Sequence, residues 1–144
     1  MKPQISVITL GVDDLDRSLR FYRDGLGLPT KGIIGTQFKG NDTSPAGAVA
    51  LFELRSGPLL CLYPRSELAK DAHLKAGAPS ATEFSIGQLV RSRDEVDTML
   101  EAAAAAGAVI PEQAHERPWG IYSGYFQDPD GHLWEIIWNP AMPG

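Results

Sequence analysis

The sequence has little cysteine and no long apolar run. Its 144 residues include one cysteine, Cys61, so no disulfide can form within the chain. The apolar runs fall far short of the roughly 20 residues that a helix needs to cross a bilayer, and the first residues lack the small-residue cleavage site of a secretory signal. We therefore expect a cytoplasmic protein without a membrane partner, in a reducing compartment.

Clustered positive charge is also missing. The chain has 13 Lys and Arg against 18 Asp and Glu, a formal net charge of −5, and the basic residues are scattered. A phosphate backbone is bound by basic patches or stripes, so we expect no nucleic-acid partner. The length fits one domain, or two half-size modules that share a core.

The first half of the chain predicts a strand, a helix and three further strands. Residues 4–12 alternate in side-chain type, with Ile8, Leu10 and Val12 on one face and Val7 and Thr9 on the other. A helix follows, capped by Asp13 or Asp14, and its apolar stripe comprises Leu15, Leu19, Tyr22 and Leu26. The three strands are expected near 31–38, 48–54 and 58–64.

The second half repeats this order after a polar stretch, 65–82, which we interpret as a linker with at most one short helical turn. A strand is predicted over 82–90, and a helix over 92–107, opened by the capping box of Ser92 and Glu95 and closed by Gly107. Further strands are expected near 108–113, 119–127 and 132–138. The pattern thus predicts an α+β chain with two βαβββ modules, about 1–64 and 83–138. Their uncovered sheet faces would pack together or leave a cavity.

Glu135 is the residue that most needs an explanation. Asp128-Pro129-Asp130-Gly131 suits a type I turn, and alternation beyond it puts Leu133, Glu135 and Ile137 on one face. A carboxylate on an apolar face must be paired, protonated, metal-bound or in a wet cavity, because burying a lone charge costs several kcal/mol. The alternative is an edge strand with that face in solvent. His132 points to the opposite face, so H-x-x-E is not a chelate here, and we expect His132 at the surface.

Two segments carry a family resemblance that covers nearly the whole chain. The opening VITLGVDDLDRSLRFYRDGLGL and the closing GYFQDPDGHLWEIIWNP, together with the two βαβββ halves, resemble the vicinal-oxygen-chelate superfamily. That superfamily includes glyoxalase I, bleomycin-resistance proteins, fosfomycin-resistance enzymes and extradiol dioxygenases. The resemblance implies one domain over 1–144, whose curved mixed sheets enclose a central cavity. It also implies a homodimer, if the modules pair across two chains.

In the enzymes of that superfamily, side chains on equivalent strands of the two modules hold a divalent metal. Carried over by the resemblance, the last-strand ligand is Glu135, while the other positions fall on Val7, Ser85 and Leu60. A shift of one or two residues offers only Glu83 and Cys61. Because a catalytic metal site needs at least three protein ligands, we expect no cofactor. The alternative is a divalent metal at Glu135.

The same reasoning predicts an apolar pocket with few polar groups. Its expected ligand-binding residues are Val7, Phe38, Leu60, Leu62, Ser85, Trp119, Tyr122, Ser123, Tyr125, Leu133 and Glu135. The first functional hypothesis is a metal-independent binder of an apolar or aromatic small molecule. The others are a metal-free isomerase or lyase with Glu135 as the catalytic general base, a divalent-metal enzyme of the glyoxalase or dioxygenase type, and a structural protein with a filled core.

Overall fold

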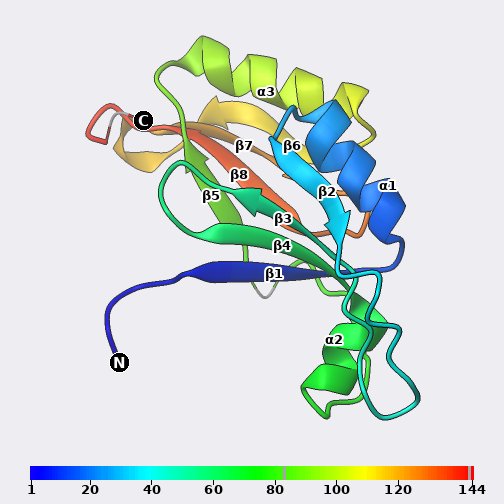
Figure 1. The fold of residues 1–144 in the computed structure, drawn as a ribbon. Coiled ribbons are helices and arrows are strands. Elements are labelled where there is room, and N and C mark those ends of the chain that lie inside the picture. The colour runs from blue at the N-terminus through cyan, green and yellow to red at the C-terminus, as the bar shows by residue number, and fades with distance from the viewer. Residues whose placement is uncertain (83, 143) are drawn as a thin grey trace. The chain divides into compact units, whose positions relative to one another are not determined.

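The structure is a computed structural model that describes residues 1–82, 84–142 and 144. The chain divides into two compact units, Met1–Ala78 and Pro79–Gly144. Each unit contains one mixed sheet of four strands with helices packed against it (Figure 1).

The first unit has the strand order β1-β4-β3-β2, in which β1 and β4 are parallel and the other pairs are antiparallel. Its elements are β1 (Val7–Val12), α1 (Leu15–Leu19), a π-helical turn (Arg20–Gly25), β2 (Thr30–Ile34), β3 (Val49–Glu53), β4 (Leu59–Pro64) and α2 (Arg65–Asp71). Asp14 caps α1 by accepting a hydrogen bond from the Arg17 backbone N–H at 3.0 Å. Leu19 and Tyr22 of the predicted stripe are buried, which fixes the helix on the sheet.

Two segments of this unit differ from the sequence prediction. The strand expected over 31–38 ends at Ile34, because Gly35 has a left-handed φ of 77° and a Cβ there would lie 2.3 Å from the Gly47 carbonyl oxygen. The expected linker begins with a full helix, α2. Its Glu67 accepts a hydrogen bond from the Ala46 N–H at 2.9 Å, and Lys70 donates to the Asn41 carbonyl at 2.9 Å. The polar residues of α2 therefore hold the loop between β2 and β3.

The second unit has the corresponding order, β5-β8-β7-β6, with β5 and β8 parallel. Its elements are β5 (Ile86–Leu89), α3 (Arg93–Ala105), β6 (Val109–Glu116), a 3₁₀ turn (Pro118–Gly120), β7 (Tyr122–Gln127) and β8 (Leu133–Trp138). Ser92 caps α3 as predicted, by accepting a hydrogen bond from the Glu95 N–H at 3.1 Å. The Glu95 carboxylate accepts a hydrogen bond from the Arg91 N–H at 2.7 Å. In a standard capping box it would accept from the N–H of the capping residue itself, Ser92.

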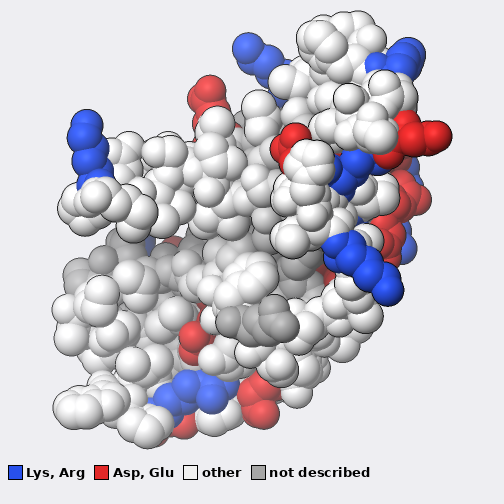
Figure 2. Space-filling view, turned by 90° about the horizontal axis from the view of Figure 1, so that it is seen from below, with Lys and Arg blue, Asp and Glu red and all other residues white. Residues whose placement is uncertain are grey.

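The two units thus repeat one topology, and the predicted fold class, α+β with two βαβββ modules, is confirmed. The central cavity stays a prediction. Within the described part of the chain, none of the helices is both long and apolar enough to cross a membrane. Basic and acidic side chains are interspersed on the face shown in Figure 2.

Candidate functional site

Among the described residues of the second unit, α3 covers one face of the sheet and no helix of the unit covers the other. α3 packs against β6, β7 and β8, and its Val96, Leu100 and Ala103 are buried together with Phe126, Trp134 and Ile136. The opposite face carries the alternate residues of β7 and β8, because paired residues of adjacent strands point to the same side. We call this the Glu135 face; its residues in β7 and β8 are Ser123, Tyr125, Gln127, Leu133, Glu135 and Ile137.

Glu135 is hydrogen-bonded to two hydroxyl groups on this face. Ser123 Oγ donates to Glu135 Oε2 at 2.7 Å. Tyr125, the cross-strand partner of Glu135, donates its hydroxyl to the same carboxylate. Burial, and then the charge and hydrogen bond of Glu135, raise the pKa of the Tyr125 hydroxyl, while Arg117 opposes this effect. The carboxylate is therefore hydrogen-bonded to neutral groups of the same sheet face.

Arg117 completes the group from the end of β6. Its Nε donates to Ser123 Oγ at 2.5 Å and its Nη2 donates to the Ser123 carbonyl at 3.2 Å. The guanidinium also lies over the Tyr125 ring, 5.3 Å from the centroid. The sequence prediction missed Arg117. One feature of the sequence could have identified it: Arg117 is the only Lys or Arg after Arg93, in a segment rich in Asp and Glu.

His115 and Glu112 extend the polar surface along β6. Two register shifts in the pairing of β6 with β7 place Glu112 opposite Tyr125 and His115 opposite Ser123. His115 Nε2 lies 3.3 Å from Glu112 Oε1, and its Nδ1 lies 2.8 Å from the Glu116 carbonyl oxygen. These bulges let two residues three positions apart share one face.

Three of the predicted ligand-binding residues lie on the wrong face for the proposed pocket. Leu60 and Leu62 pair with Ile8 and Leu10 and are fully buried in the first unit, on the opposite side of the sheet from Val7. Tyr122 points toward α3, where its hydroxyl donates to Asp97 Oδ1 at 2.7 Å. These assignments are corrected: Leu60 and Leu62 are core residues, and Tyr122 anchors α3.

Four further predicted residues lie in exposed positions of one unit or the other. Val7 is 48% exposed in β1, and Phe38 is exposed in the loop after β2. Ser85 is exposed just before β5. Trp119 is 91% exposed in the turn after Arg117 and has a left-handed φ of 70°. The Arg117 N–H closes this turn by donating to the Ile121 carbonyl at 2.7 Å.

The residues at the family metal positions do not fit a divalent catalytic ion. Val7 and Leu60 offer hydrocarbon side chains, and Leu60 lies in the core. Cys61 is buried, which raises the pKa of its thiol and disfavours the thiolate that binds metals. Glu83 lies outside the described residues. Glu135 alone supplies a good ligand, and it already accepts two protein hydroxyls.

One other cluster has ligand-type side chains. Asp128, Asp130 and His132 bring three such atoms within 4.8 Å of one another. The Asp128 carboxylate accepts the backbone N–H groups of Asp130 and His132 at 3.0 and 2.8 Å, and its Oδ2 lies 2.7 Å from His132 Nδ1. These contacts order the turn before β8. They also correct the surface placement of His132, whose side chain is only 13% exposed.

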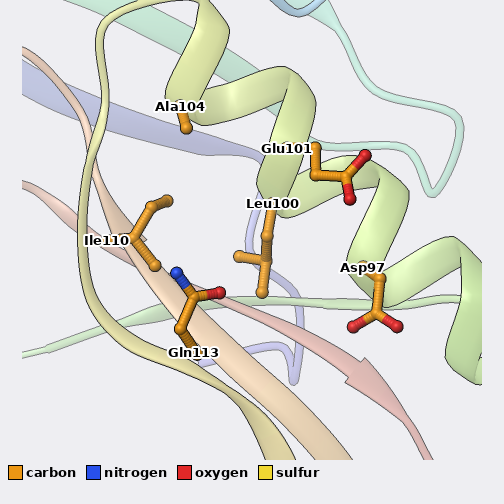
Figure 3. A pocket seen from close by; sticks show the side chains of 6 residues that line it. All are labelled: Asp97, Leu100, Glu101, Ala104, Ile110 and Gln113. Atoms are coloured by element: carbon orange, nitrogen blue, oxygen red, sulfur yellow. The ribbon is translucent and has the colours of Figure 1, made fainter.

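A recess of about 230 Å³ lies between α3 and β6 (Figure 3). Its lining residues are Asp97, Leu100, Glu101, Ala104, Ile110 and Gln113. Most of these side chains are exposed, and Asp97 is the partner of Tyr122. The recess is shallow and lies on the α3 side of the sheet, so it is separate from the Glu135 face.

Comparison with known proteins places this geometry in a family. Residues 4–136 match the family model of the Glyoxalase/Bleomycin resistance protein/Dioxygenase superfamily. The chain belongs to this superfamily. A glyoxalase-related enzyme from Fulvimarina pelagi is 30% identical, with a TM-score of 0.80 and coverage of 98% of this chain and 91% of that chain. A search of curated proteins gives no match.

Two further members of the superfamily share the fold at lower identity. A glyoxalase/bleomycin resistance protein/dioxygenase from Nocardioides is 24% identical, with a TM-score of 0.73 over 100% of this chain and 91% of that chain. Lactoylglutathione lyase from Agrobacterium tumefaciens is also 24% identical, with a TM-score of 0.67 over 96% and 95% of the two chains. These similarities support the superfamily fold.

Proposed function

We propose that this superfamily member is a metal-independent binder of an apolar or aromatic small molecule, and that the ligand lies against the Glu135 face. The observation that supports this proposal best is the connected group of Arg117, Ser123, Tyr125 and Glu135. Such a group is a fixed polar centre bordered on the β8 and β5 side by Leu133, Ile137 and Leu89, and a few placed polar groups beside apolar side chains are usual in a small-molecule site.

The apolar part of the surface comes from the neighbours of Glu135 on the sheet. Leu133 and Ile137 flank it along β8, and Leu89 of β5 pairs with Ile137. On the β5 side Glu135 pairs with Gly87, which has no side chain. A Cβ at Gly87 would lie 3.2 Å from Ile137 Cδ1, so Ile137 borders the β5 side of the carboxylate, where we place the ligand, and Tyr125 lies on its other side.

Metal independence is supported by the donor set. Two hydroxyl groups already donate to the Glu135 carboxylate and occupy part of its acceptor capacity. Arg117 supplies a positive charge one hydrogen bond further away. The homodimer and the cytoplasmic location remain predictions, as does a role for Glu135 as a general base.

The proposal is tested by filling the space beside Glu135. Binding of aromatic compounds to chelator-treated protein is measured by calorimetry, and recovery of each compound is checked by mass spectrometry. We expect binding without turnover. Gly87→Val should weaken it at least about tenfold, equivalent to about 1.4 kcal/mol, because the new side chain occupies the ligand position.

Gln88→Val is the matched control, because Gln88 is the next residue of β5, is exposed, and points to the opposite face. Its affinity should equal that of the wild type. Equal loss in both variants, or binding that appears only after a divalent metal is restored, would contradict the proposal.

A further inference from the structure

We infer that the Glu135 face selects a ligand with a protonated amine on an aromatic or apolar body. This inference rests on the proposed function and names the class of molecule that the site would bind. It comes from the direction of the hydrogen bonds around Ser123, from the acceptor capacity that Glu135 retains, and from the charge of the second unit.

Arg117 fixes the direction of the hydrogen-bond chain. A guanidinium group has donors only, so the 2.5 Å contact between Arg117 Nε and Ser123 Oγ makes the serine oxygen an acceptor. The serine hydroxyl has one proton, which therefore points to Glu135 Oε2 at 2.7 Å. Ser123 is fully buried, so water does not compete for this proton. Both hydrogen bonds therefore donate in the same direction, from Arg117 through Ser123 to Glu135.

Four protein donors of this face are directed at protein atoms. The Ser123 hydroxyl and the Tyr125 hydroxyl both donate to Glu135. The Nε and Nη2 groups of Arg117 both donate to Ser123. A carboxylate has about four acceptor positions, so Glu135 still has capacity for a further donor. Its half-buried side chain lies beside Gly87, where a ligand N–H can reach it.

The charge of the second unit favours a cation over a neutral donor. Residues 79–144 include ten Asp and Glu but only three Lys and Arg. One of these three is Arg117, and another, Arg93, pairs with Glu116 at 2.6 Å and lies over the Tyr122 ring on the α3 side. Glu112 adds a second carboxylate on the β6 side of the Glu135 face. The negative potential of these carboxylates attracts a ligand with an ammonium group and repels a ligand with a carboxylate.

Three probes with the same body separate the alternatives: 2-phenylethylamine, 2-phenylethanol and 3-phenylpropanoate. Their dissociation constants are measured at neutral pH by NMR titration of the Gly87, Tyr125 and Leu133 amides. We expect the amine to bind at least about tenfold more tightly than the carboxylate, because its ammonium group donates to the Glu135 carboxylate, which repels a second carboxylate. The alcohol should fall between them.

Glu135→Gln is the decisive variant, because it keeps the shape of the side chain and removes its charge. We expect the amine to lose about tenfold in affinity and the alcohol to change little. Glu101→Gln is the matched control: it removes one charge from exposed α3, on the other side of the sheet, and should leave both affinities unchanged. The thermal midpoint of each variant verifies folding.

Failure of the inference and failure of the proposed function give different results. If the carboxylate binds as tightly as the amine, or if Glu135→Gln and Glu101→Gln behave alike, the amine class is wrong while a small-molecule site remains. If none of the three probes shifts the amides of the Glu135 face, the proposed function fails together with the inference.

Discussion

At the scale of single residues, Ser123 connects the two opposite charges of the site. Its hydroxyl accepts from Arg117 and donates to Glu135, and its carbonyl accepts a second bond from Arg117. The side chain is 0% exposed. A small neutral residue thereby satisfies both charged groups at once, which reduces the cost of keeping them partly away from water.

Ser123→Ala should lower the free energy of unfolding by about 1–3 kcal/mol, because Arg117 and Glu135 each lose a partner in a partly buried position. Urea denaturation measures this change. Ser56→Ala, in the exposed turn before β4, should stay within about 0.5 kcal/mol of the wild type. Equal stability of the two variants would show that the hydroxyl has no structural role.

Single residues also show how far the sequence determines the site. Alternation along β8 correctly placed Glu135 with Leu133 and Ile137, and Ser123 and Tyr125 joined them as expected. Leu60, Leu62 and Tyr122 were assigned to the wrong face because a one-residue error in register moves a side chain across the sheet. Arg117 could not be placed from periodicity, because its contact depends on the irregular turn that follows β6.

At the scale of elements, β7 lies close to both α3 and β6. Gly124 of β7 allows this approach: a Cβ there would lie 2.5 Å from Leu100 Cδ1 and 2.8 Å from the Ala114 backbone nitrogen. Capping residues and apolar stripes predicted both main helices. They did not predict the π-helical turn after α1 or the helix α2, whose positions depend on tertiary contacts.

Gly124→Ala should destabilise the protein by about 1–3 kcal/mol, because the added methyl forces the Ala114 backbone to move. Chemical denaturation of the purified variant provides the measurement. Gly77→Ala is the comparison, since no atom lies within 4 Å of the position of its Cβ. It should be neutral or slightly stabilising. A neutral result at Gly124 would mean that α3 and β6 can separate freely.

At the scale of the whole molecule, three of the four tyrosines have a raised pKa. The hydrogen bond to Asp97 is the main cause for Tyr122, and burial is the main cause for Tyr63 and Tyr125. The folded state therefore favours the neutral phenol in both units. Its stabilisation is fully present below the unfolded pKa, near 10, and is lost as the pH rises through the folded values.

Stability should consequently fall as the pH rises above about 10, and tyrosine contributes to the slope. The double variant Tyr122→Phe/Tyr125→Phe cannot ionise at these positions, so its stability should fall less steeply over the same range. Denaturant midpoints at a series of alkaline pH values measure both slopes, and lysine deprotonation contributes equally to the two proteins. Identical slopes would exclude this contribution of the two phenols.

The bulges of β6 have a consequence for variation within the superfamily. Val109, Glu112 and His115 of β6 pair with Gln127, Tyr125 and Ser123 of β7, so each step of three residues along β6 matches a step of two along β7. Each bulge adds one extra residue to β6 and so shifts the alternation of its side chains by one position. Deletion of one residue between Glu112 and His115 would remove the second bulge, and the two side chains, then two positions apart, would still share the Glu135 face by ordinary strand alternation. The edge strand can thus change its length without turning either side chain away from this face and without a substitution in the core.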